Sequence, residues 1–143
     1  MVDRQVDIHT AGAILIKDKK LLLTHELGKH FYIAPGGKVE TGESSEEAVI
    51  RELEEEVNIQ VTLPNLAFFG TFYAQAAGAE HKYLQMDVFL VTDWSGDPSP
   101  NSGEEEIDDI AWVNTISKPD NIQIGSIFEH QVMPKLKLLG LID

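Results

Sequence analysis

Three glutamates in one acidic segment have the spacing that a metal site needs. Residues 36–59 read GGKVETGESSEEAVIRELEEEVNI, and Glu52, Glu55 and Glu56 stand there at i, i+3 and i+4. At about 100° per residue these three positions share one side of a helix. Mg²⁺ and Mn²⁺ take oxygen ligands, and carboxylates that converge from one rigid helix suit them. The spacing therefore indicates a divalent-cation site.

The alternative interpretation is an ordinary solvated helix face. Like charges four residues apart, such as Glu52 and Glu56, destabilise a helix by a few tenths of a kcal/mol. Something should compensate for that repulsion, and a bound divalent cation would do so. Glu54 is expected to point away from the other three glutamates, which gives a comparison within one helix. From the helix alone both interpretations stay open.

The surrounding residues predict the helix that carries these side chains. Ser44 is a suitable N-cap, and Glu47 three residues later completes a capping box. Asn58 follows the last turn, at a position that often takes the left-handed conformation. A stripe about 100° wide is expected to be buried and consists of Val49, Ile50, Leu53 and Val57.

The remaining segments predict strands and one further helix. Residues 8–17 and 18–26 are apolar runs joined by a polar turn, which predicts a hairpin. A short strand is expected before Pro35. Residues 66–75 and 82–94 are expected to form a pair of strands, and a further strand is expected at residues 107–114. Residues 125–142 predict a helix interrupted or kinked at Pro134. Together these elements imply an α/β (α+β) fold in which a mixed sheet packs against helices.

Length and composition are those of an ordinary globular domain. The chain has 143 residues, of which 43% are hydrophobic and 24% charged. This length fits one domain spanning residues 1–143, and the sequence shows no repeat, low-complexity tract or plausible linker. There is no cysteine, so disulfides and thiolate metal sites are excluded.

The charge balance limits the partners of the chain. Asp and Glu number 24 against 11 Lys and Arg, a formal net charge of -13. Such a chain should repel nucleic acid and anionic membranes, so neither is expected as a partner. The N-terminus lacks the layout of a signal peptide, and no apolar stretch approaches the roughly 18 residues of a membrane span. We therefore expect a cytoplasmic protein.

The acidic segment is similar to a known family signature. Residues 37–59 read G-x5-E-x7-R-E-L-E-E-E-V-N-I, which resembles the signature of the Nudix (MutT-like) hydrolases, G-x5-E-x7-R-E-U-x-E-E-x-G-U, where U is bulky and aliphatic. Only Asn58, in place of glycine, departs from it. The strands at the start of the chain and Trp112 in IAWVN also match, so the resemblance covers roughly the whole chain. The matching positions are Gly37, Glu43, Arg51, Glu52, Leu53, Glu55, Glu56 and Ile59.

The resemblance implies a fold, a reaction and a cofactor. The family fold is an α/β/α sandwich around a mixed sheet. The family hydrolyses a nucleoside diphosphate linked to another group with Mg²⁺ or Mn²⁺. Carried over to this chain, Glu52, Glu55 and Glu56 are the expected metal ligands, with the backbone carbonyl of Gly36 as a further ligand. Either Glu52 or Glu55 would orient or deprotonate the attacking water.

Other motif residues are expected to support this site. We count Arg51 with the catalytic residues, and expect it to anchor the loop by pairing with Glu43 rather than to touch substrate. Gly37 and Glu43 are expected to be structural. A distant loop contains Glu104, Glu105 and Glu106, which either send one carboxylate into the metal site, as in some relatives, or are solvated.

The sequence does not identify a single substrate. We expect a nucleoside triphosphate to be hydrolysed to a monophosphate and pyrophosphate. ADP-ribose or a dinucleotide is the alternative substrate, and a non-catalytic nucleotide sensor is the alternative function, although the intact carboxylate set argues against a sensor. The sequence does not decide whether the protein is a monomer or a homodimer. The aromatic residues considered for stacking on a base, each also a candidate core residue, are Tyr32, Phe69, Phe72, Tyr73 and Tyr83.

Overall fold

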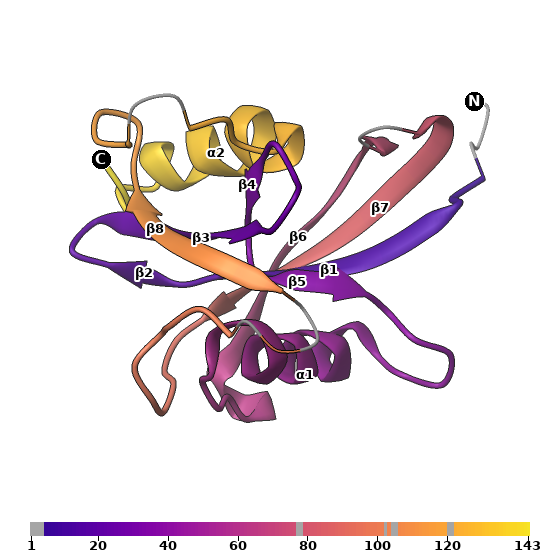
Figure 1. Ribbon diagram of the computed structural model, residues 1–143, viewed down its shortest axis with the longest axis horizontal. Coiled ribbons are helices and arrows are strands. Elements are labelled where there is room, and N and C mark those ends of the chain that lie inside the picture. The colour runs from indigo at the N-terminus through magenta and orange to yellow at the C-terminus, as the bar shows by residue number, and fades with distance from the viewer. Residues whose placement is uncertain (1–4, 77–78, 102, 104–105, 120–121) are drawn as a thin grey trace.

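The computed structural model of the chain places strands between two helical layers (Figure 1). Helix α1 (Ser45–Val57) lies on one side of the strands and helix α2 (Met133–Leu138) on the other. The expected α/β/α sandwich is confirmed, with its strands divided between two four-stranded sheets. The structure describes residues 5–76, 79–101, 103, 106–119 and 122–143.

The first sheet includes a strand at the start of the signature segment. Its order is β5 (Gly36–Lys38), β1 (Ile8–Ile14), β7 (Ala79–Val91) and β6 (Leu66–Ala76). Strand β1 runs parallel to β7 and antiparallel to β5, and β6 pairs antiparallel with β7. The sheet is therefore mixed, and the predicted pairing of the two long strands β6 and β7 is confirmed.

The second sheet is centred on β3 (Lys20–Glu26). Strand β3 pairs antiparallel with β2 (Ile16–Lys17), β4 (Tyr32–Ile33) and β8 (Ile107–Val113). A short 3₁₀ helix at Leu63–Asn65 precedes β6 in the first sheet. The predicted strand at residues 107–114 is thus present as β8, beside β3 rather than beside its neighbours in sequence.

The predicted hairpin between residues 8–17 and 18–26 is wrong over most of its length. Strand β1 pairs with β5 and β7, and only the two residues of β2 pair with β3. The chain crosses from one sheet to the other at Leu15, and the tight turn follows at Asp18 and Lys19, whose φ angles are 53° and 59°. Hydrophobic runs identify strands, but they do not identify which strands pair.

Helix α1 has the predicted ends and the predicted buried stripe. The Ser44 hydroxyl accepts a hydrogen bond from the Glu47 N–H, and the Glu47 carboxylate accepts one from the Ser44 N–H, both at 3.1 Å. Asn58 ends the helix in the left-handed conformation, with φ 60° and ψ 33°. Val49, Leu53 and Val57 are fully buried, and Ile50 is partly buried against the same cluster.

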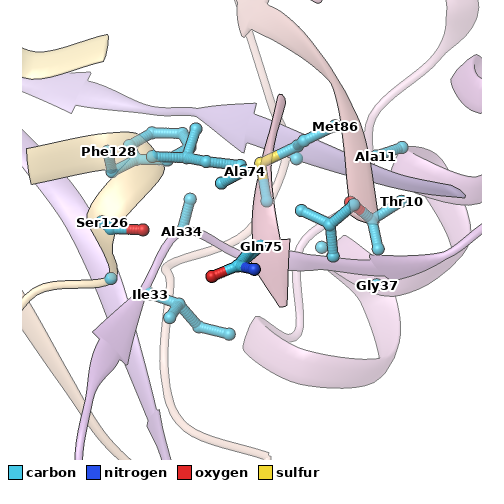
Figure 2. Close-up of a pocket in the computed structure, with 15 residues that line it drawn as sticks. Thr10, Ala11, Ile33, Ala34, Gly37, Ala74, Gln75, Met86, Ser126 and Phe128 are labelled. Atoms are coloured by element: carbon cyan, nitrogen blue, oxygen red, sulfur yellow. The ribbon is translucent and has the colours of Figure 1, made fainter. Parts of the chain in front are cut away.

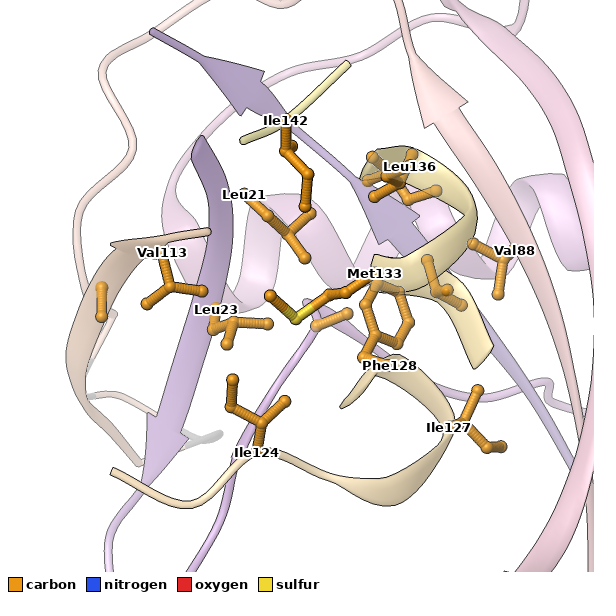
Figure 3. Packing of buried hydrophobic residues seen from close by; sticks show 14 residues of the cluster. Leu21, Leu23, Val88, Val113, Ile124, Ile127, Phe128, Met133, Leu136 and Ile142 are labelled. Carbon is orange, nitrogen blue, oxygen red and sulfur yellow. The ribbon is translucent and has the colours of Figure 1, made fainter. Parts of the chain in front are cut away.

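Two hydrophobic cores hold the layers together. Helix α1 packs on the small side chains of Ala11 and Ala13 in β1, which allow close approach. The second core lies under α2, where Met133 and Phe128 face Leu23 of the second sheet (Figure 3). Both faces of β1 and β3 are consequently covered, and these strands form the centre of the molecule.

The C-terminal helix is interrupted, as predicted, but by a wide turn rather than by a simple kink. A π-helical turn spans Phe128–Val132 and leads directly into α2, where Pro134 occupies the second position. Proline lacks an N–H and its ring clashes with the carbonyl four residues before it, so the regular ladder cannot continue through it. No helix among the described residues is long and apolar enough to cross a membrane.

Candidate active site

The four glutamates at the end of α1 differ sharply in exposure. Glu52 and Glu56 are only 6% and 5% exposed, Glu55 is half-buried, and Glu54 is exposed. The predicted division of the helix into an inward carboxylate face and an outward Glu54 is therefore confirmed. Carboxylates are almost never buried unless they are paired, so an ordinary solvated face does not describe Glu52 and Glu56.

Each inward carboxylate accepts hydrogen bonds from a nearby donor. Glu56 Oε1 accepts from the backbone N–H of Gly36 at 2.6 Å. Arg51 Nη1 donates to Glu52 Oε1 at 2.8 Å and to Glu55 Oε2 at 3.2 Å. The three carboxylates share a face without converging on one point. Among the described residues no group of three or more acidic or histidine side chains is arranged to hold a metal ion.

Arg51 joins the helix to the loop before it. Its Nε and Nη2 donate to the two oxygens of Glu43 at 2.8 and 3.0 Å, and Nη2 also donates to the Lys38 carbonyl at 3.1 Å. The predicted pairing of Arg51 with Glu43 is thus observed. The guanidinium hydrogen bonds lower the pKa of Glu43 to about 2, and those with Glu43 and then Glu52 raise the pKa of Arg51.

Two glycines allow this loop to lie against the carboxylates. A Cβ on Gly37 would lie 2.6 Å from Glu52 Oε1, and a Cβ on Gly36 would lie 2.1 Å from the Ala11 carbonyl oxygen. Gly36 also has a φ of 152°, which side chains rarely adopt. The structural role expected for Gly37 therefore has a physical cause, since any side chain there would displace the Glu52 carboxylate.

The chemical types of the donors, rather than their arrangement, fit a hard divalent cation. Glu52, Glu55 and Glu56 offer carboxylate oxygens within one helical turn, and the backbone of Gly36 lies within hydrogen-bonding distance of Glu56. The missing side chain of Gly37 lets the Glu52 carboxylate lie directly against the loop. Arg51 pairs with Glu52 and Glu55 and also with Glu43, so its single positive charge leaves the face with a net negative charge. The assignment of individual ligands stays a prediction.

A second polar network fixes the other end of α1, and no sequence motif indicates it. Asp87 of β7 is mostly buried, which raises its pKa, but the hydrogen bonds it accepts outweigh burial and lower it. Ser45, the first residue of α1, is one donor at 2.6 Å. The other donors to Asp87 are His9, Thr71 and Gln85. These residues are too far apart in sequence to form a motif.

An apolar cavity lies across the first sheet from the body of α1, and it reaches the same loop (Figure 2). Its volume is about 240 Å³, and Gly36 and Gly37 form part of its wall. Met86 and Phe128 supply much of its apolar lining, and Gln75 brings an amide to it. Segments from β1, β4, β6, β7 and the turn before α2 meet there, so no local pattern predicts the cavity.

The predicted aromatic candidates lie elsewhere. Phe69 and Phe72 pack against the core under α2, and Tyr73 and Tyr83 stack on each other with ring centroids 5.7 Å apart. The aromatic ring that lines the cavity belongs to Phe128, which begins the π-helical turn. Tyr32 instead donates a hydrogen bond to Asp109. Sequence reasoning missed Phe128 because helical periodicity explains it as a core residue.

Of the three candidate loop carboxylates, only Glu106 belongs to the described part of the chain. Glu104 and Glu105 lie outside the described residues. Glu106 is exposed, has a φ of 51°, and accepts a hydrogen bond from the Leu27 N–H through its backbone carbonyl at 3.0 Å. A part for any of these three glutamates in the site stays a prediction.

Sequence comparison assigns the chain to a family. Residues 8–121 match the family model of the NUDIX domain. The chain is 32% identical over 101 residues to an uncharacterized Nudix hydrolase, YvcI, of Bacillus subtilis, a match that covers 71% of this chain and 62% of that protein. It is 31% identical over 107 residues to the 8-oxo-dGTP diphosphatase of Proteus vulgaris, covering 72% of this chain and 91% of the relative.

Solved structures agree with this assignment. A MutT structure from the study of Aliivibrio salmonicida and Vibrio cholerae superposes with a TM-score of 0.68 at 29% identity, covering 92% of this chain and 98% of that one. The MutT Nudix hydrolase of Burkholderia pseudomallei shares the fold, with a TM-score of 0.67 at 24% identity over 81% and 89% of the two chains. The chain belongs to the Nudix hydrolases, which are pyrophosphohydrolases that generally use divalent metal ions.

Proposed function

We propose that this Nudix hydrolase cleaves a nucleoside triphosphate to a nucleoside monophosphate and pyrophosphate in a Mg²⁺-dependent reaction. One observation carries the proposal: the buried carboxylate face of α1 and the apolar cavity meet at Gly36 and Gly37. A nucleotide has one highly charged end, its phosphates, and one uncharged end that carries a flat aromatic base. The site offers a matching pair of environments separated by two residues without side chains.

The cavity suits the nucleoside end of such a substrate. No charged side chain contributes to its lining among the described residues, and Met86 and Phe128 offer polarisable and aromatic surface. Thr10, Gln75 and Ser126 add a few hydrogen-bonding groups to an otherwise apolar wall. Ligand sites usually combine apolar lining with a small number of such polar groups, which fix the orientation of the ligand.

The carboxylate face suits the phosphate end only together with cations. Glu52, Glu55, Glu56 and the Gly36 carbonyl would hold the metal, which when bound would neutralise phosphate charge and lower the pKa of a water molecule. Without it, a chain of net charge -13 repels polyphosphate. Glu52 or Glu55 would accept the proton of the attacking water. Arg51 keeps the loop and the helix in register through Glu43.

The relatives favour a triphosphate over the alternative substrates. The Proteus protein is named for 8-oxo-dGTP, and a relative of the same name from Haemophilus influenzae is 34% identical over 108 residues. An oxidised guanine nucleotide is therefore the first triphosphate to test. ADP-ribose and dinucleotides remain the alternative substrates. A sensor function is less well supported, because a binding module has no need for two buried carboxylates.

The test is a substrate panel with product identification. Purified protein with Mg²⁺ is incubated with the common nucleoside triphosphates, 8-oxo-dGTP, ADP-ribose and a diadenosine polyphosphate, and products are separated by ion-exchange chromatography. We expect a monophosphate and pyrophosphate from a triphosphate, and no turnover in EDTA. Preferential cleavage of ADP-ribose would select the alternative substrate. Full activity in EDTA, or no cleavage of any compound, would overturn the proposal.

A further inference from the structure

Residues 95–101, which we call the clamp segment, lie against the C-terminal end of α1. The last carbonyl groups of a helix lack partners within the helix. Here the N–H of Asn101 donates to the Glu56 carbonyl at 2.9 Å, and the N–H of Ser99 donates to the Val57 carbonyl at 3.1 Å. The clamp segment therefore completes the hydrogen bonding of the turn that carries Glu56.

The start of the clamp segment is fixed by its backbone. Ser95 and Gln60 exchange two backbone hydrogen bonds of 2.9 Å each. Gly96 follows with a φ of 99°, and a Cβ there would lie 3.0 Å from the Asn58 carbonyl oxygen. The backbone approaches the end of α1 this closely only because residue 96 has no side chain.

Asn58 adds the side-chain contact of the clamp. Its Nδ2 donates to the carbonyl oxygen and to the hydroxyl oxygen of Ser99, each at 3.2 Å. Asn58 is the residue that departs from the family signature, where glycine stands. Glycine would provide the left-handed backbone equally well, but it has no amide to reach Ser99.

We propose that Asn58 is a positioning residue for the carboxylate face of α1. Its amide holds Ser99, the clamp segment holds the carbonyls of Glu56 and Val57, and the ordered turn fixes the direction of the Glu56 carboxylate. Helix ends fray when their carbonyls lack partners, and a frayed turn would present Glu56 over a range of directions. The inference rests on the proposed function, because it requires Glu56 to bind a cation.

The decisive variant is Asn58→Gly, which keeps the left-handed backbone and removes both side-chain hydrogen bonds. Mn²⁺ binding to the protein without nucleotide is measured by titration calorimetry, and amide hydrogen exchange is measured at Ser99 and Asn101. We expect about fivefold weaker Mn²⁺ binding and about tenfold faster exchange at both amides. The KM for nucleotide at saturating Mg²⁺ should stay within about twofold of wild type.

Two further variants separate positioning from a general loss of stability. Ser99→Ala removes one of the two hydrogen bonds, so its Mn²⁺ affinity should fall between wild type and Asn58→Gly. Asn65→Ala removes two side-chain hydrogen bonds from Thr62, at a turn that does not carry Glu56. It should lower the melting temperature without weakening Mn²⁺ binding. Equal weakening in Asn65→Ala and Asn58→Gly would overturn the inference.

The two proposals fail in different ways. If the wild type binds Mn²⁺ and Asn58→Gly binds it equally tightly, the positioning role is wrong while the proposed function stands. If the wild type binds no Mn²⁺, the proposed function is wrong, and the positioning role is overturned with it.

Discussion

The carboxylate face of α1 and the apolar cavity meet at Gly36 and Gly37, yet they are built by opposite means. The carboxylate face comes from one continuous run, residues 36–59, in which helical spacing brings the glutamates together. The cavity comes from residues scattered between 10 and 128 and depends on strand order. The first is charged and held by ion pairs, whereas the second is almost entirely apolar.

This difference suggests that the carboxylate face carries out the chemical step and that the cavity selects the substrate. Changes on the carboxylate face should act on the chemical step, because they alter groups that interact with the developing transition state. Changes in the cavity should act mainly on substrate binding, because the nucleoside is held alike before and during reaction. Variants in the two regions should therefore divide between kcat and KM.

Glu56→Gln should lower kcat by at least a hundredfold, about 2.7 kcal/mol of transition-state stabilisation. The substitution keeps the size of the side chain and removes one buried charge from the face. Glu54→Gln is the matched control, because Glu54 lies two residues away and is exposed; it should stay within a few-fold of wild type. The measurement is the initial rate at saturating Mg²⁺. Equal small effects in both variants would mean that the carboxylate face is an ordinary charged surface with no catalytic role.

Gly37→Ala should lower kcat about thirtyfold while the protein stays folded. The new Cβ would lie 2.6 Å from Glu52 Oε1, and the flexible carboxylate would move before the backbone does. The control is Gly42→Ala in the same loop, where φ is 83° but no atom lies within 4 Å of the Cβ. It should cost about 1 kcal/mol of stability through backbone strain and little activity. Melting temperature and kcat are measured for both variants. A kcat for Gly37→Ala as high as that for Gly42→Ala would show that the clash with Glu52 is harmless.

Ala74→Leu should raise KM about tenfold and leave kcat within a few-fold. Ala74 lines the cavity from β6, and a longer side chain there occupies space that we assign to the nucleoside. Ala67→Leu, an exposed position on the same strand, should change neither parameter. A fall in kcat at constant KM would contradict the division between the two regions. The nucleotide that gives the highest rate in the panel is the appropriate substrate.

The same contrast explains how much could be predicted from the sequence. The capping box at Ser44, the left-handed Asn58 and the inward Glu52 all follow from local rules, and all were predicted. The expected hairpin failed because β1 is paired by strands that lie far away in sequence. Phe128 and the Asp87 network were missed for the same reason, since tertiary contacts alone give them their roles.

The smallest effect concerns the ion pair that supports the carboxylate face, and it should depend on pH. Arg51 lowers the pKa of Glu43 from 4.5 to about 2, so the folded state favours the ionised carboxylate. A lowered pKa contributes stability that is fully present above pH 4.5, where the unfolded chain is also ionised. That contribution is lost as the pH falls from 4.5 towards 2, because the unfolded chain takes up the proton first.

Glu43→Gln removes this contribution while it keeps an oxygen that can accept one hydrogen bond. Wild type should exceed the variant by about 1 kcal/mol in the free energy of unfolding near pH 7, a typical value for a partly exposed ion pair. The difference should shrink between pH 4.5 and 2, and urea unfolding at several pH values measures it. Ala74→Leu, on the cavity side, should show no such narrowing relative to wild type. A constant Glu43→Gln difference down to pH 2 would mean that hydrogen-bond geometry, rather than charge, holds the loop on α1.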